Sequence, residues 1–530
     1  MSETATDLGT TPSPPVIPIG FFGWLRWAWR ALTSMRVALM LLFLLALASV
    51  PGSLFPQRGS KPLEVSAYLA RHKTLGPILD RIGMFNVFGS AWFAAIYLLL
   101  FISLAGCVIP RSRLHLRAIR ARPPIAPVHP ARLPGGSSWA SPAPLGQLGP
   151  LVLGEAARTF RRSRWRTEIA ELGDGPARER GYVSAEKGYA RETGNLLFHV
   201  ALLVLLVGVG LGSAFGWKGQ VIVKEGDGFA NTVTQYDTFT AGRLVDQSTL
   251  PPFTVKLDAF DITYQDGGPQ NGEPLAFGAQ VSTSGAPGSP AVPGVITANH
   301  PLGIGGARVY LIGHGYAPHI VVRDKTGKVV FDDTVVFLPQ DGNFTSQGVV
   351  KIPDMTPQLG LQGFFLPTAF VDPVLGPSSV FPGPKNPALL LSAWRGDLGL
   401  NSGTPQSVYR LDLTHLKRIS IKELRPGDTW ILPDGSGTVA FVDIAQYATL
   451  SVAYDPGKGV ALVSALTAIL GLMLSLFVRR RRIWVRVSDS GSGGTLVEVG
   501  GLTRVDSTDV SAEVARMVTA LWAMAPEAKE

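Results

Sequence analysis

Four stretches of this chain are apolar over about 20 residues each, the length that a helix needs to cross the hydrocarbon core of a bilayer. They cover residues 37–55, 87–109, 196–215 and 459–478, and none contains a lysine, arginine, aspartate or glutamate. A buried helix of a soluble protein rarely stays uncharged on every face for so long. Only 16% of the 530 residues are charged, against about a quarter in soluble proteins. The pattern therefore predicts four transmembrane helices.

The first stretch also has one feature of a signal peptide, because Ala46, Leu47 and Ala48 resemble a small-residue cleavage site. A secretory signal starts with a short charged region, whereas 36 residues precede this stretch. Three further apolar stretches follow it. We therefore interpret the first stretch as an uncleaved membrane anchor.

Basic residues flank the four stretches unevenly, and lysine and arginine mark the cytoplasmic side of a membrane protein. Three such clusters fall on one side if the chain crosses four times: Arg26, Arg30 and Arg36; Arg111, Arg113, Arg117, Arg120 and Arg122; and Arg479, Arg480, Arg481 and Arg482. The short loop 56–86 has five basic residues on the other side, but the reverse topology would place all three clusters outside. The sequence thus predicts a multi-pass protein of the cytoplasmic membrane with both termini in the cytoplasm.

These assignments divide the chain into nine parts. They are a cytoplasmic N-terminal segment (1–36), transmembrane helix 1 (37–55), a short outer loop (56–86), transmembrane helix 2 (87–109), a cytoplasmic basic loop (110–194), transmembrane helix 3 (196–215), an extracytoplasmic β-rich domain (216–455), transmembrane helix 4 (459–478) and a cytoplasmic tail (479–530).

The large segment 216–455 has the texture of a β domain, because runs of alternating apolar and polar residues are separated by glycine, proline and aspartate turns. Residues 325–328 predict a hairpin turn, and the Gly-, Pro- and Ser-rich stretch 266–293 predicts a loop or insertion. A β-sandwich or two smaller β units fits best. The predicted fold class is therefore a membrane protein with four transmembrane α-helices and a large extracytoplasmic, mostly-β domain.

The net charge of +9 does not indicate nucleic-acid binding. Residues 216–456 contain 16 basic against 21 acidic residues, so the basic excess lies beside the membrane, where it sets topology and meets anionic lipid. The predicted cytoplasmic loop and tail show little regular pattern. Residues 151–169 offer one short α/β piece, and the tail predicts a strand at 483–489 and a helix from Ser511 to Ala525.

His199 is the sharpest candidate for chemistry, since it is an ionisable residue inside a predicted transmembrane helix. Such residues are costly in a bilayer and usually functional. A neutral imidazole can ligate haem iron, relay a proton or hydrogen-bond to a neighbouring helix, and the residues alone leave these three alternatives open.

Other candidate residues are weaker. His314 and His319 lie five residues apart across a turn, a spacing that does not favour a metal site, and we interpret these two, with His300, as surface or turn residues. His72, His115, His129 and His415 have no second ligand nearby in sequence and are interpreted as solvated. Cys107 is the only cysteine, which excludes disulfides, a CxxC pair and a CxxCH haem site. It is interpreted as a small packing residue.

Four sequence blocks carry a family resemblance. They are WRALTSMRVALMLLFLLALASVPGSLFPQ (residues 29–57), EKGYARETGNLLFHVALLVLLVG (186–208), NHPLGIGGARVYLIGHGYAP (299–318) and YDPGKGVALVSALTAILGLMLSLFVRRRRIWVRV (454–487). In this order they resemble ResB, the cytochrome c biogenesis protein of the system II pathway, and they span most of the chain.

The resemblance implies a function. ResB acts with ResC, a multi-span partner with a tryptophan-rich haem-handling motif, to move haem across the membrane and present it for thioether attachment to the CxxCH motif of apocytochrome c. It implies that His199 is an axial ligand to the iron of haem b, which is carried transiently as substrate. The tryptophan-rich motif does not occur in this sequence, so the catalytic motif is expected in a separate ResC-type partner and no catalytic residue is assigned here. The alternative is a membrane-anchored assembly scaffold whose β domain binds partner proteins without contacting haem.

Overall fold

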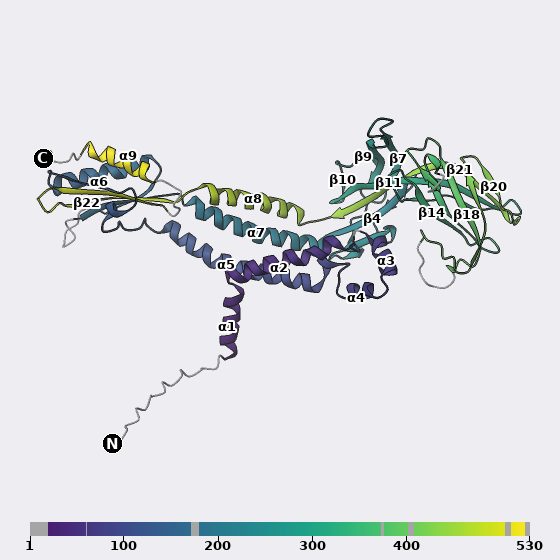
Figure 1. Ribbon diagram of the computed structural model, residues 1–530, viewed down its shortest axis with the longest axis horizontal. Helices are drawn as coiled ribbons and strands as arrows, with labels where there is room; N and C mark the ends of the chain where they lie inside the picture. The colour runs from purple at the N-terminus through teal and green to yellow at the C-terminus, as the bar shows by residue number, and fades with distance from the viewer. Residues whose placement is uncertain are drawn as a thin grey trace, which may run out of the picture. The chain divides into compact units, whose positions relative to one another are not determined.

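The computed structural model describes residues 20–59, 61–170, 180–372, 376–400, 408–503 and 510–524 (Figure 1). Residues 1–19 of the predicted N-terminal segment lie outside this set. The chain forms two compact units. The first unit is Met1–Val209 together with Lys458–Glu530, and the second, the β unit, is Gly210–Gly457.

Four helices of the described chain are long and apolar enough to cross a membrane: α2 (Met35–Leu54), α5 (Ala91–Arg120), α7 (Ala190–Phe215) and α8 (Lys458–Phe477). They contain the four apolar stretches of the sequence. Ser34 and Ser90 cap α2 and α5, each accepting a backbone N–H of the first turn at 3.3 Å. Helix α5 continues for 11 residues beyond the apolar stretch that predicted it, because leucine, arginine and alanine, which dominate its last turns, are strong helix formers.

Short helices accompany these four. Helix α1 (Phe21–Leu32) precedes α2 and leaves it at a steep angle, while α3 (Pro62–Arg71), α4 (Leu75–Arg81) and the 3-10 turn η1 (Val87–Gly89) connect α2 to α5 (Figure 1).

Helices α7 and α8 touch where each has a glycine. A Cβ at Gly194 would lie 2.6 Å from Cβ of Leu474, and one at Gly471 would lie 2.6 Å from the backbone nitrogen of Phe198. Small residues allow helix backbones to approach closely in membrane proteins. The two glycines therefore hold the third and fourth apolar helices together at this level.

A separate α/β domain in the first unit joins the loop after α5 to the tail after α8. We call it the loop–tail domain. It consists of the 3-10 turn η2 (Pro130–Arg132), β1 (Ser137–Ser141), α6 (Leu145–Arg162), β2 (Arg166–Ala170), β3 (Arg180–Lys187), β22 (Arg481–Asp489), β23 (Thr495–Thr503) and α9 (Ser511–Trp522). The strand order is β1-β23-β22-β3-β2, and every neighbouring pair is antiparallel. The two tail strands thus lie inside a sheet whose other strands come from the loop.

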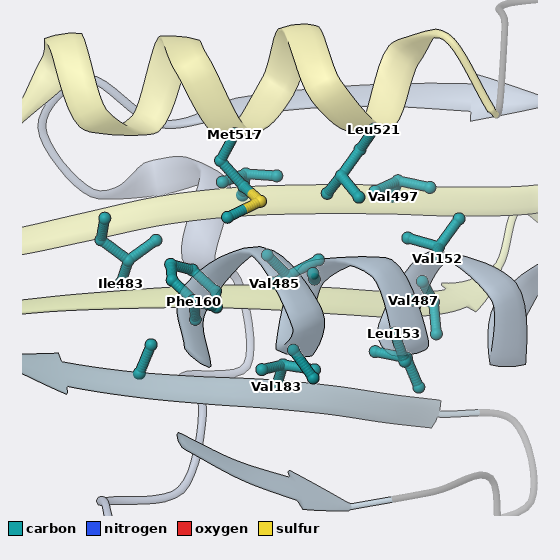
Figure 2. Packing of buried hydrophobic residues seen from close by; sticks show 14 of the residues in the cluster. Val152, Leu153, Phe160, Val183, Ile483, Val485, Val487, Val497, Met517 and Leu521 are labelled. Carbon is teal, nitrogen blue, oxygen red and sulfur yellow. The ribbon is translucent and has the colours of Figure 1, made fainter. Parts of the chain in front are cut away.

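One face of this sheet packs on α6 and α9. Phe160 of α6 and Met517 of α9 share one apolar cluster with Val485 of β22 and Val183 of β3, and Val183 and Val485 are fully buried (Figure 2). The opposite face is crossed by the segment that follows α5. There the carbonyl oxygen of Pro124 accepts from Ser184 and Trp484. The sequence predicted pieces of both segments, including a tail strand and a tail helix, but not their assembly into one domain.

The described residues of the β unit form three main antiparallel sheets and a small hairpin. The first holds β10 (Leu302–Ile304), β11 (Ala307–Asp324), β21 (Gly437–Tyr454), β4 (Trp217–Lys224) and β6 (Thr238–Ala241), with β12 (Val329–Thr334) on β11 and β20 (Thr429–Ile431) on β21. The second holds β13 (Leu338–Pro339), β14 (Ser346–Ile352), β15 (Leu359–Leu366), β18 (Ala388–Gly396) and β19 (Leu416–Leu424). The third holds β5 (Gly228–Ala230), β7 (Thr254–Tyr264), β8 (Pro274–Ser284) and β9 (Val292–Ile296), and the hairpin is β16 (Ala369–Asp372) with β17 (Gly376–Ser379). Short 3-10 turns also occur in this unit, among them η3 (Val233–Gln235) and η4 (Gln247–Thr249).

Two apolar cores share the long strands β11 and β21. Val309 of β11 and Leu450 of β21 belong to one core. Ile320 of β11 and Phe441 of β21 belong to the other. This arrangement confirms the mostly-β prediction, and it shows two apolar cores inside one compact unit. The predicted hairpin at residues 325–328 is confirmed between β11 and β12. The loop predicted at 266–293 is wrong in part, because β8 pairs with both β7 and β9 there.

Candidate functional site

His199 lies on α7, one turn beyond Asn195. Its Nδ1 is 2.7 Å from the backbone carbonyl oxygen of Asn195. A carbonyl oxygen only accepts hydrogen bonds, so Nδ1 carries the proton and Nε2 of the neutral ring keeps its lone pair. Metal-binding histidines are commonly oriented in this way, by a hydrogen bond from the nitrogen that does not bind the metal. In this geometry Nε2 is the ring nitrogen that is able to accept a hydrogen bond or to bind a metal.

His199 opens onto a groove of about 780 Å³ between α2, α5 and α7. Most of its wall is aliphatic, with contributions from all three helices: Met35, Leu39 and Leu42 from α2, Leu100, Leu104, Val108 and Leu114 from α5, and Leu196, Leu202, Leu205 and Leu206 from α7. Its polar lining residues are few, and a predominantly apolar wall with a small number of polar groups is typical of ligand sites.

The polar groups gather at one end of the groove. They are Cys107, Arg111 and His115 on α5 and Glu192, Asn195 and His199 on α7. His115 is only 9% exposed, with Nε2 at 3.0 Å from the hydroxyl of Thr193 and Nδ1 at 3.7 Å from a carboxylate oxygen of Glu192. The interpretation of His115 as solvated was therefore wrong. Helix α5 continues past its apolar stretch and places this residue against α7.

An ion-pair network supports this polar end from the side of α8 and the loop–tail domain. Arg480 pairs with both Glu192 and Glu186, and its guanidinium lies 4.5 Å from the ring centre of Tyr189. Burial alone would raise the pKa of Glu186, but hydrogen bonds from Tyr189, Arg482 and Arg480 outweigh it and hold that pKa below its ordinary value. Glu186 is therefore a charged, buried anchor for Arg480, which in turn positions Glu192 beside His115.

Cys107 supports a turn. Its thiol donates to the carbonyl oxygen of Thr33 at 2.8 Å, and Ser103 donates to that of Leu32 at 2.5 Å. Gly106 lies between them, where a Cβ would meet the Thr33 side chain at 2.1 Å. These contacts fix the turn between α1 and α2 on α5, in agreement with the interpretation of Cys107 as a packing residue.

The histidines of the β unit are not part of this groove, and their environments differ from one another. His314 is stacked between Phe260 and Phe344, with ring centres 5.0 and 4.6 Å away, and its Nδ1 is buried without a hydrogen-bond partner. Burial lowers its pKa to about 4, so its interpretation as a surface or turn residue was wrong. His319 lies between Asp332 and Asp443, whose hydrogen bonds and charges raise its pKa.

The remaining histidines agree with their interpretation as solvated, surface or turn residues. His72, His129, His300 and His415 are exposed. Within the described ranges, no three His, Cys, Asp or Glu side chains come together as a metal-binding group.

The sequence singled out His199 as a candidate, but it did not indicate that Arg111 and His115 line the same groove. A signal existed, because Leu104, Val108, Arg111 and His115 follow the i, i+4, i+7, i+11 spacing of one helix face. The apolar span was taken to end at residue 109, so the face was not followed into the basic segment.

These features define the class of the molecule: a protein with four helices suited to a membrane, a large β unit and a helix-lined groove containing an oriented imidazole. Comparison with known sequences then gives the family. The chain belongs to the ResB-like family, whose sequence profile matches residues 35–515.

Individual relatives have low sequence identity to this chain, but some of them align with most of its length. The chain is 25% identical to cytochrome c biogenesis protein CcsB of Synechococcus sp. (strain RCC307), over 88% of this chain and 90% of that protein. With the protein of the same name from Synechococcus sp. (strain WH7803) it is 24% identical, over 92% and 96%. With that of Thermosynechococcus vestitus (strain NIES-2133 / IAM M-273 / BP-1) it is 25% identical over 54% of this chain, and the match spans only 60% of that protein's length.

Proposed function

We propose that this chain is a subunit of a cytochrome c biogenesis complex and that its groove receives haem as a transported substrate, with His199 as an axial ligand. The observation that carries the proposal is the oriented ring of His199, whose Nε2 is available at an apolar groove large enough for a porphyrin. Neutral imidazole nitrogen is an ordinary ligand of haem iron. Membership of the ResB-like family and the similarity to cytochrome c biogenesis proteins support the same proposal.

In this proposal the basic flanks of α5 and α8 face the cytoplasm and the β unit faces outward, as positive charge beside a span favours. The polar end of the groove then lies toward the cytoplasmic leaflet, where haem made inside the cell would enter. A ResC-type partner completes the pathway and carries out thioether attachment to the CxxCH motif of apocytochrome c, since no catalytic residue is assigned to this chain.

The decisive experiment is the absorption spectrum of the detergent-purified complex of this chain with its coexpressed ResC-type partner. The variant His199→Ala is expected to weaken or shift the Soret band and to lower cytochrome c maturation while the protein remains in the membrane. His415→Ala, which changes an exposed histidine of the β unit, is the matched control and should match the wild type.

A haem-loaded complex whose spectrum and maturation activity are unchanged by His199→Ala would place all ligands in the partner. The alternative, a membrane-anchored scaffold whose β unit binds partner proteins without contacting haem, would then be the better description.

A further inference from the structure

Arg111 differs from the other ionic residues of the groove. Glu192 pairs with Arg480, and His115 faces Glu192 and Thr193. Arg111 directs one terminal nitrogen, Nη2, to the thioether sulfur of Met35 at 2.6 Å, and in the described part of the chain no carboxylate lies within ion-pair distance of it. A thioether is a weak acceptor, whereas a guanidinium has five donors. Arg111 is therefore a cation at the groove whose hydrogen-bonding capacity is mostly unused by the protein.

The register of α5 and α7 places Arg111 near the level of His199. The two helices run in opposite directions, with the hydroxyl of Tyr97 bonded to the carbonyl oxygen of Leu206 and His115 beside Thr193. Arg111 precedes His115 by one helical turn of about 5.4 Å, which brings it level with Asn195 and Leu196. The ring of His199 points back toward that same level through its bond to Asn195. The free cation and the oriented imidazole thus belong to one part of the groove.

This combination specifies an acidic, amphipathic ligand. Arginine pairs with carboxylates through two parallel hydrogen bonds, and such charge-assisted bonds are stronger in a site of low dielectric constant. The aliphatic wall suits the flat apolar body of a ligand, but it offers nothing to a carboxylate. A carboxylate of such a ligand would find a partner at Arg111.

We propose that Arg111 binds a propionate carboxylate of haem and so sets the orientation of haem in the groove. This inference rests on the proposed function, because it requires haem at His199. It makes Arg111 a specificity-determining residue that distinguishes a porphyrin with free acid groups from a neutral one. The headgroup of an anionic phospholipid offers similar oxygens with a net negative charge, and the experiment separates the two sources.

The test compares ferric protoporphyrin IX with its dimethyl ester. The full chain, coexpressed with its partner in a haem-starved host, is reconstituted in phosphatidylcholine nanodiscs, and each porphyrin is titrated while the Soret band is followed. The wild type is expected to bind the diacid about tenfold more tightly than the diester, the size of effect for one charge-assisted pair. Arg111→Met should bind both equally and keep the wild-type band position, and Arg111→Lys should retain part of the preference.

Arg113→Met is the matched control, because Arg113 is exposed on the same helix but does not line the groove. It removes the same charge and should leave the tenfold preference intact. The proposal is overturned if Arg111→Met keeps that preference or if Arg113→Met loses it equally. It is also overturned if phosphatidylglycerol abolishes the preference in the wild type, since Arg111 would then be a lipid-phosphate site.

The same titration distinguishes failure of the proposed function. His199→Ala should weaken the binding of both porphyrins and alter the Soret band, while the preference for the diacid over the diester persists. Spectra of His199→Ala that match the wild type would refute the haem ligand itself, whereas a normal His199 effect without an Arg111 effect would refute the carboxylate assignment alone.

Discussion

Glu186 and Arg480 form a buried ion pair across 294 residues of chain, with Nε of the arginine 2.6 Å from a carboxylate oxygen. The Glu186 side chain is fully buried and that of Arg480 is 15% exposed. Glu186 is the penultimate residue of β3, and Arg480 lies between α8 and β22. The pair therefore connects the loop–tail domain to the helices that form the groove.

Replacing Glu186 by Gln should destabilise the protein by about 3 kcal/mol, because removing one partner of a buried ion pair leaves an uncompensated charge. Two arginines would be affected, since Arg482 also donates to this carboxylate at 2.8 Å. Thermal unfolding in detergent measures the effect. Glu168→Gln is the control, because its partner Arg122 is 84% exposed, and exposed pairs contribute about 0.5 kcal/mol. Equal losses in the two variants would contradict the role given to Glu186.

Removing residues 481–530 should expose the loop between α5 and α7 to proteases. The truncation deletes β22, which is the central strand of the loop–tail sheet, and its neighbour β23. With α9 it also removes the partners of Val183 and Phe160 in the apolar cluster. Trypsin should then cleave at Arg158, Arg161 and Arg162, which α6 holds in the intact protein. A chain ending at Met524 is the control and should resist cleavage. Protection of the loop in the longer truncation would show that it folds without the tail.

The local sequence pattern predicted the apolar helices and some elements of the tail, but it did not predict how the tail pairs with the loop between α5 and α7. The apolar helices were predictable because about 20 uncharged residues have one favourable environment. The tail strand β22 and helix α9 were visible as short patterns. Their partners were not, because pairing of β22 with β3 joins residues about 300 positions apart, and strand pairing leaves no signal in either strand alone. His199 was singled out by the cost of an imidazole in a bilayer, whereas the 9% exposure of the His115 side chain depends on where α5 passes α7.

Gly106→Val should destabilise the packing of α1 and α2 on α5. A Cβ at this position would lie 2.1 Å from the Thr33 methyl group and 2.8 Å from Thr33 Cβ, so the turn between α1 and α2 must move. Overpacking of this kind costs about 1–3 kcal/mol. Gly154→Val, in α6, is the control, because a Cβ there meets nothing within 4 Å. The apparent melting temperature in detergent should fall further for Gly106→Val, and an equal fall would indicate only a general cost of valine in a helix.

His314 should make the stability of the β unit depend on pH. It lies on β11 between Leu311 of one core and Tyr316 of the other, and its ring stacks on Phe260 and Phe344. Burial lowers its pKa from 6.5 to about 4, so the unfolded chain binds the proton more readily than the folded one. The free energy of unfolding is therefore highest above pH 6.5, and it falls by up to about 3 kcal/mol as the pH drops toward 4.

His314→Phe replaces the imidazole with a ring that fits between the same two phenylalanines and cannot be protonated. The free energy of unfolding, measured by denaturant titration at several pH values, should lose its decline between pH 6.5 and 4. His319→Gln provides a control of opposite sign. Hydrogen bonding to Asp332 and the nearby charge of Asp443 raise the pKa of His319, so its ion pairs stabilise the fold below pH 6.5 and weaken as the pH rises through the folded-state pKa. Losing them should steepen the acid decline. An unchanged pH profile in His314→Phe would mean that this histidine is protonated in place without disturbing either core.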